Sequence, residues 1–254
     1  MSRAKRSWGV YLGVLLSFLL VGAVVAMTVQ PVVLDMRMSG RDMSAPIRVE
    51  NNGPNELPVE VRIVETDFSE DAVGPSNRVS EDIMVFPPQA IIPPGETQVF
   101  RLQYVGDPAS DRSKHYYAEV SQLPIQLPEG QSAIQILYNF QVMVNVASSL
   151  AGAPALTVET SEIVPTEDGK RVAAFTVRNS SLNYGYVSSG QLTFIFRTPD
   201  GRETGRVALS SSEIQQTIGF GLLGPQMTRR IVTAVEAPTP DSVVEVILNM
   251  PRGR

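Results

Sequence analysis

Apolar and polar residues alternate along the stretch from Gln131 to Val146. Every second position there is apolar: Ile134, Ile136, Tyr138, Phe140, Val142, Val144 and Val146. Successive side chains of a β-strand point to opposite faces, so the alternation predicts a strand with one apolar face. A typical strand has about five or six residues. One small sheet is therefore not expected to cover this whole face.

Shorter runs rich in β-forming residues precede this stretch, at 29–35, 44–51, 57–65, 83–87, 97–105 and 114–123. Turn-forming residues separate them, including Asn51-Asn52-Gly53-Pro54, Gly74-Pro75 and Pro93-Pro94-Gly95. Proline cannot donate to a strand ladder and glycine adopts unusual backbone angles, so both mark strand ends. Together with the long strand, these runs predict an immunoglobulin-like sandwich.

A segment of small residues from Ala147 to Pro154 predicts a linker, and a second series of β-rich runs follows it. These runs lie at 155–160, 171–179, 186–197, 202–209, 227–235 and 242–250. Asp168-Gly169 and Asp200-Gly201 are typical of hairpin turns. No long helical pattern occurs, so the predicted fold class is all-β with two domains, at 27–148 and 149–254.

Residues 1–26 have the composition of a secretory signal. Arg3, Lys5 and Arg6 precede an apolar run that ends in the small-residue pattern Ala23-Val24-Val25-Ala26. A basic end, an apolar middle and small residues predict cleavage after Ala26. The alternative is an uncleaved anchor helix, because the apolar run reaches the lower length limit for a membrane span.

The charge and the cysteine content limit the possible partners of the chain and the ways in which its fold is stabilised. The full chain has a net charge of −5, and removing residues 1–26 lowers its 21 basic residues to 18 while leaving 26 acidic ones, a net charge of −8. Such a chain has no overall attraction for nucleic acid. The chain has no cysteine, so packing alone must hold it together outside the cytoplasm.

Candidate catalytic and metal-binding residues are few. His115 is the only histidine, which excludes a two-histidine metal site and makes any serine triad depend on this residue. Its setting between strand residues favours a structural role. Glu65, Asp67, Glu70 and Asp71 form an acidic cluster, but the loop lacks the glycine and final glutamate of an EF-hand. We therefore expect a binding protein without enzymatic activity, cofactor or metal.

Three stretches of the first domain carry a family resemblance: SAPIRVENNGPNELPVEVRI, MVFPPQAIIPPGETQVFRL and KHYYAEVSQLP. Followed by a long alternating strand, they resemble the PapD-like periplasmic pilus chaperones of the chaperone-usher pathway. The resemblance covers nearly all of 27–150, and the second domain matches more loosely, mainly through GLLGPQMTRRIV at 221–232. It implies two immunoglobulin-like β-sandwich domains joined at an angle.

The resemblance also implies a use for the long strand. In this family, the last strand of the first domain inserts alternate apolar side chains into a pilin that lacks its own seventh strand. Ile134, Ile136, Tyr138 and Phe140 match the donated positions. The implied partners are a pilin-like or surface-fibre subunit and an outer-membrane usher, in the periplasm. Whether a free molecule caps itself as a homodimer stays open.

One feature of the family is missing. Its members hold the client's terminal carboxylate with two basic residues between the domains, at positions that align near Gln30 or Pro31 and at Met143. A buried carboxylate without a cation is costly, so another residue substitutes or the client is held differently. Arg101 and Lys114 are candidate anchors by residue type, and surface charges are the alternative for both.

Two other functions stay open from the residues alone. A long strand joining two domains is also apolar when it is simply central and covered on both faces. In that case the protein would be an exported adhesive or scaffold module, which could self-associate through the same strand. An exported hydrolase is the third possibility and would depend on His115.

Overall fold

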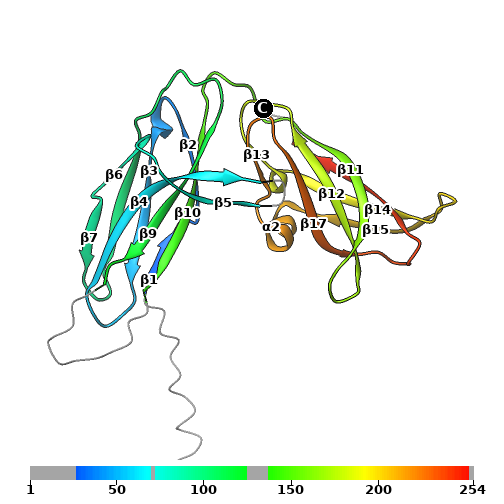
Figure 1. Cartoon of the computed structure of the whole chain (residues 1–254), viewed down its shortest axis with the longest axis horizontal. Coiled ribbons are helices and arrows are strands. Elements are labelled where there is room, and N and C mark those ends of the chain that lie inside the picture. The colour runs from blue at the N-terminus through cyan, green and yellow to red at the C-terminus, as the bar shows by residue number, and fades with distance from the viewer. Residues whose placement is uncertain (1–26, 70–71, 125–136, 252–254) are drawn as a thin grey trace, which may run out of the picture.

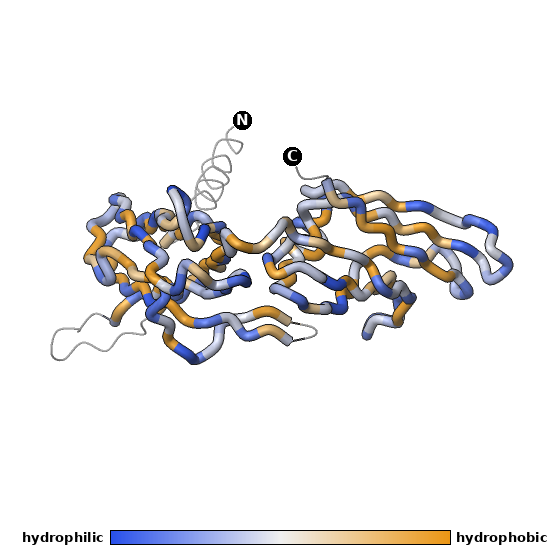
Figure 2. Tube along the Cα trace, turned by 90° about the horizontal axis from the view of Figure 1, so that it is seen from above, coloured by the Kyte–Doolittle hydropathy of each residue, from blue (hydrophilic) through white to orange (hydrophobic). Residues whose placement is uncertain are grey.

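A computed structural model describes residues 27–69, 72–124 and 137–251 of the chain. The β-strands form two domains set at an angle, which gives the molecule the outline of an inverted V (Figure 1). After a turn of 90°, the two domains are seen joined by a narrow connection, with apolar residues along the strands of both (Figure 2). The predicted fold class, all-β with two sandwich domains joined at an angle, is confirmed.

The first domain is a sandwich of two sheets. One sheet has the strand order β1-β3-β8-β6, and the other has the order β2-β10-β9-β4-β5 with β7 also paired to β4. The strands are β1 (Met27–Gln30), β2 (Val33–Arg37), β3 (Ser44–Asn51), β4 (Leu57–Phe68), β5 (Val73–Val79), β6 (Ile83–Phe86), β7 (Gln89–Ile92), β8 (Thr97–Tyr104), β9 (Lys114–Gln122) and β10 (Asn139–Ala147). A short 3₁₀ turn, η1 (Arg41–Met43), precedes β3.

The predicted strand at 29–35 is wrong in one respect, because it divides at Pro31. β1 pairs antiparallel with β3 in one sheet, whereas β2 pairs parallel with β10 in the other. Proline has no backbone N–H to continue a ladder. The interruption lets the chain cross from one sheet to the other.

Alternating side chains of the two sheets fill the core of the first domain. On β8, Phe100, Leu102 and Tyr104 are fully buried, and Val142, Val144 and Val146 of β10 face them from the other sheet. Gly74-Pro75 lies inside β5 and does not form the predicted turn. β5 is the edge strand of its sheet, a position where proline is tolerated.

The second domain begins after a connection between Ala147 and Leu156. Its sheets have the orders β11-β12-β17, β13-β16 and β15-β14-β18. The strands are β11 (Leu156–Pro165), β12 (Arg171–Asn179), β13 (Gly185–Tyr186), β14 (Gln191–Arg197), β15 (Glu203–Leu209), β16 (Leu222–Leu223), β17 (Thr228–Glu236) and β18 (Val243–Asn249). Among the described residues, the two domains share no sheet, and each has its own apolar core.

The two predicted hairpins are present, and one helix was not predicted. Gly169 and Gly201 have φ values of 80° and 90° in the turns that join β11 to β12 and β14 to β15. The helix α2 (Ser211–Ile218) begins with a capping box between Ser210 and Glu213, and it buries Ile214. Its signal in the sequence is the short Ser-x-x-Glu spacing. A short 3₁₀ turn, η2 (Val187–Ser189), follows β13.

Candidate functional site: an open strand edge beside the interdomain cleft

The long strand is paired on both sides along only part of its length. β9 pairs with β10 from Asn139 to Val146, whereas β2 pairs with it only from Met143 onward. From Asn139 to Val142, no described strand pairs with the second side of β10. This segment is an open sheet edge, a template for pairing with another chain.

The backbone of the open edge presents two residues to an incoming strand. The carbonyl of Tyr138 accepts from the N–H of Gln122 at 2.9 Å, so it points toward the β9 side. The N–H of Met143 donates to the carbonyl of Val32 at 3.0 Å, on the opposite side. Backbone groups alternate sides along an antiparallel pair. Asn139 and Gln141 therefore direct their N–H and C=O groups outward.

The apolar face of the strand is covered less completely toward its beginning. Val142 and Val144 are buried in the core of the first domain. Tyr138 and Phe140 continue the same face, but they are only half-buried against that core. Ile134 and Ile136, the other two predicted donor residues, lie outside the described residues. The domain's own core thus leaves part of the face of Tyr138 and Phe140 uncovered.

A row of polar residues crosses the same sheet where it faces the second domain. Asp35 on β2, Asn145 on β10 and His115 on β9 are directly opposite one another in register. Asn145 is fully buried and His115 is 9% exposed. The ring nitrogen Nδ1 of His115 lies 2.7 Å from Oδ1 of Asn145, and Nε2 lies 3.1 Å from the hydroxyl of Ser113. Burial lowers the pKa of His115 to about 4, so the ring is neutral.

Two tyrosines of the second domain complete this row. Tyr184 and Tyr186 donate their hydroxyls to Oδ1 of Asp35 at 2.9 and 2.6 Å. Tyr186 also accepts from Nδ2 of Asn145 at 2.6 Å. Burial, followed by the proximity of Asp35, raises the pKa of both tyrosines. Both hydroxyls are therefore protonated donors.

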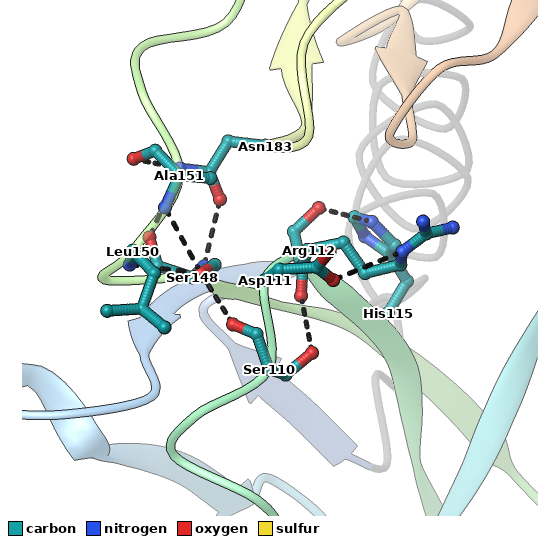
Figure 3. A network of polar contacts seen from close by, with 9 residues as sticks. Ser110, Asp111, Arg112, His115, Ser148, Leu150, Ala151 and Asn183 are labelled. Carbon is teal, nitrogen blue, oxygen red and sulfur yellow. Dashed lines mark hydrogen bonds and ion pairs between the residues drawn. The ribbon is translucent and has the colours of Figure 1, made fainter.

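The connection between the domains is held by a second set of polar contacts (Figure 3). Ser148 donates its hydroxyl to the carbonyl of Ser110 at 2.7 Å, and its backbone N–H donates to Oδ1 of Asn183 at 2.8 Å. Asn183 also donates to the carbonyls of Ser148 and Ala151. Asn183 of the second domain thus holds the start of the connection, and Ser148 joins the connection to Ser110 of the first domain.

Among the described residues, both domains contribute to the lining of three cavities. The first, of about 410 Å³, includes Arg37, Ser148, Asn183 and Tyr184 in its lining. The second, of about 370 Å³, is lined by residues of β4 and β9 and by Pro225 and Met227. The third, of about 380 Å³, is lined by residues that include Val32, Val33 and Asp35 on one side and Ser211 and Phe220 on the other. This third cavity adjoins the point where β2 begins to pair with β10.

The structure places the two predicted carboxylate anchors on different sheets. Arg101 is exposed on β8, between the buried Phe100 and Leu102, so it lies on the outer face of the sandwich. Lys114 begins β9 and lines the second cavity. Their role as anchors stays a prediction.

The ammonium group of Lys114 already has a partner within the first domain. It lies 2.8 Å from Oδ2 of Asp82, which also accepts from the Tyr116 hydroxyl at 2.5 Å. Burial lowers the pKa of Lys114, but the hydrogen bond to Asp82 and the nearby charges outweigh it, and the net pKa is raised. For Asp82, burial opposes the same hydrogen bonds and the net pKa is lowered.

Sequence reasoning missed Arg37, Asp35, Asn145 and the two tyrosines. Arg37 is a basic residue on β2 that lines the first cavity, and no salt bridge to it occurs among the described residues. The only sequence signal was a polar Asn145 between the apolar Val144 and Val146. Because the row depends on the register of three strands, spacing along the chain does not show it.

The predicted acidic cluster has another use in the structure. Glu65 and Asp67 both bind the guanidinium of Arg78, at 2.6 and 2.7 Å, whereas Glu70 and Asp71 lie outside the described residues. No group of three or more potential metal ligands comes together in the described part of the chain. Within that part, no helix has the length and apolar character needed to cross a membrane.

A family profile described as "Pili and flagellar-assembly chaperone, PapD N-terminal domain" matches residues 27–146. The first domain of this chain belongs to the PapD pilus-chaperone family. Members of this family are periplasmic chaperones and not enzymes, so the expectation of a non-enzymatic protein is confirmed. Comparison with curated proteins gave no match.

Solved structures of chaperones are similar to this chain. The YadV chaperone has a TM-score of 0.51 at 14% identity, covering 88% of this chain and 99% of its own. The Escherichia coli chaperone DraB has a TM-score of 0.49 at 11% identity, covering 88% and 92%. The Pseudomonas aeruginosa CupB2 chaperone has a TM-score of 0.45 at 14% identity, covering 88% and 100%. The YadV likeness shows the two-domain fold alone.

Proposed function

We propose that this PapD-like protein is a periplasmic chaperone that binds pilus or related surface-fibre subunits through the open edge of β10. The client would pair with Asn139 and Gln141 and bury Tyr138 and Phe140 in its own incomplete core, with Ile134 and Ile136 as further donated side chains. The chaperone would then deliver the client to an outer-membrane usher. The supporting observation is the strand edge from Asn139 to Val142, which is open and only partly covered.

The magnitudes are sufficient for such a complex. Burying an apolar side chain of this size contributes about 1.5–3 kcal/mol. Each backbone hydrogen bond to the open edge adds about 1 kcal/mol. Four buried side chains and the backbone hydrogen bonds of two residues therefore offset a substantial part of the free-energy cost of association. Neither a covalent step nor ATP is needed.

Client capture is tested by pulldown of the tagged protein from its native periplasm, followed by mass spectrometry. We expect a small β-rich partner in equal amount, and we expect Tyr138→Asp to lose it because the charge would enter the client's apolar core. Asn139→Asp is the matched control, since it places the same charge on the opposite, exposed face of the strand. Equal recovery of the partner with both variants would contradict the proposal.

The same experiment separates the alternative function. Recovery of other copies of this chain alone, lost in Tyr138→Asp, would favour an adhesive or scaffold module that self-associates through β10. Mass spectrometry of the exported protein also tests the signal peptide. A mature chain beginning at Met27 is expected, and a retained N-terminus would indicate an anchor.

The carboxylate anchor is proposed among the cations of the first domain. Lys114 lines one interdomain cavity and Arg37 lines another, whereas Arg101 lies on the outer face. If a client carboxylate binds in the cleft, replacing the responsible cation leaves that charge without a partner. We expect Lys114→Gln or Arg37→Gln to weaken client recovery more than Arg101→Gln. A larger loss of client recovery with Arg101→Gln than with either of the other two variants would place the anchor outside the cleft.

A further inference from the structure

Every member of the polar row of Asp35, Asn145 and His115 contacts a tyrosine of the second domain. They lie on three neighbouring strands, in one register line across the sheet. Asn145 and His115 belong to strands whose flanking residues Val144, Val146 and Tyr116 face the core of the first domain. The row therefore lies on the opposite face of the sheet, covered by the second domain.

Donors and acceptors match along the whole row. Ser113 donates to Nε2 of His115, the Nδ1–H of His115 donates to Oδ1 of Asn145, and Nδ2 of Asn145 donates to the hydroxyl of Tyr186. Tyr186 then donates to Asp35, which accepts from Tyr184 as well. This assignment requires a neutral histidine with its proton on Nδ1, and burial of the ring favours the neutral form.

The ring of His115 also makes aromatic contacts with both domains. The ring of His115 packs edge-on against Phe68 at the end of β4, with 5.1 Å between ring centroids. It packs against Tyr184 of the second domain at 5.5 Å. The backbone N–H of Ser113 donates to the carbonyl of Leu182 at 2.9 Å. One imidazole thus contacts both domains.

Other orientations of the domains would leave this row unpaired. Asn145 is fully buried, and a buried amide is costly unless its hydrogen bonds are made. Its amide group donates to Tyr186, which only the second domain supplies. Interfaces between domains permit relative motion unless specific contacts prevent it.

We propose that Asp35, Asn145 and Tyr186 are positioning residues that hold the two domains at one angle. Asn145 belongs to β10, so the contact that fixes the second domain is made by the same strand that carries the open edge. The cleft at the end of that edge is therefore formed before any client binds. The positioning itself is a property of the free chain, and only its consequence for client capture rests on the proposed function.

The absence of native cysteine allows a direct test on the full chain. Glu56→Cys in the first domain and Asp200→Cys in the second place spin labels on exposed residues, and pulsed electron paramagnetic resonance measures the distance between them. We expect one narrow distribution for the labelled parent. Tyr186→Phe and Asp35→Ala are expected to broaden or shift it, while Asp35→Asn retains an acceptor oxygen and has a smaller effect.

Tyr104→Phe is the matched control, because it removes a tyrosine hydroxyl that bonds only within the first domain, to the carbonyl of Asp107. Circular dichroism establishes that each variant is folded. A parental distribution in folded Tyr186→Phe and Asp35→Ala would overturn the positioning role. Failure of the client proposal gives a different result, namely no partner in the pulldown with the distance distributions unaffected.

Discussion

His115 has a structural environment that makes protein stability depend on pH. Its ring is enclosed by Ser113, Asn145, Phe68 and Tyr184, and burial lowers its pKa to about 4. The ordinary pKa of an unfolded histidine is about 6.5. Between these two values, the unfolded chain binds more protons than the folded chain. The free energy of unfolding therefore falls as the pH decreases through this window, and this contribution is complete above it.

We expect His115 to account for a loss of about 3 kcal/mol in the free energy of unfolding between neutral pH and pH about 4. The measurement is urea denaturation across this pH range for the parent and for His115→Gln. The difference between the two proteins in how the free energy of unfolding changes with pH isolates the contribution of this residue. The variant should show a shallower decrease. Identical pH profiles would mean that His115 is not a buried neutral group.

The strand β10 divides into two parts with different roles. The part after Met143 has strands on both sides and buries valines in the core of the first domain. The part before it has β9 on one side only. Backbone groups alternate in direction along a strand. Before Met143, the backbone of Phe140 therefore bonds to β9, whereas the backbone of Gln141 faces outward.

Two proline substitutions distinguish pairing with β9 from pairing with a client. Gln141→Pro removes an outward N–H group. We expect the fold to persist, because prolines are tolerated on strand edges, and we expect client recovery to be lost. Phe140→Pro removes a bond to β9 and is expected to lower the melting temperature. Thermal denaturation and the periplasmic pulldown measure the two effects. A Gln141→Pro protein that retains its client would show that the open edge is not used.

The molecule offers one open edge, for which two kinds of partner would compete. A client strand and the β10 edge of a second copy cannot both occupy the outward groups of Asn139 and Gln141. We therefore expect a one-to-one complex with client, and any homodimer of the free protein to dissociate when client is added. Size-exclusion chromatography with light scattering measures both states.

Gln141→Pro is the control for this prediction as well. If a homodimer forms through β10, the variant should be monomeric at concentrations where the parent is dimeric. A complex that contains two chaperone copies for each client would contradict a single shared edge.

Local patterns in the sequence were sufficient for much of the architecture. The strands at 44–51 and 171–179 occur as predicted, and so do the hairpins at Asp168-Gly169 and Asp200-Gly201. Period-two alternation and turn chemistry act over a few neighbouring residues, so they can be recognised in a linear chain. The helix α2 is short, and its capping box was the only signal, which explains why it was missed.

The pattern of residues was enough to predict an all-β chain and a long one-faced strand, and the family resemblance added the donor positions. The folded structure was needed to show that β2 pairs with β10 only from Met143 onward, which leaves the edge open from Asn139 to Val142. It also aligned Asp35, Asn145 and His115 beneath Tyr186. Both features depend on register between strands far apart in the chain, and register is set by packing across the whole sheet.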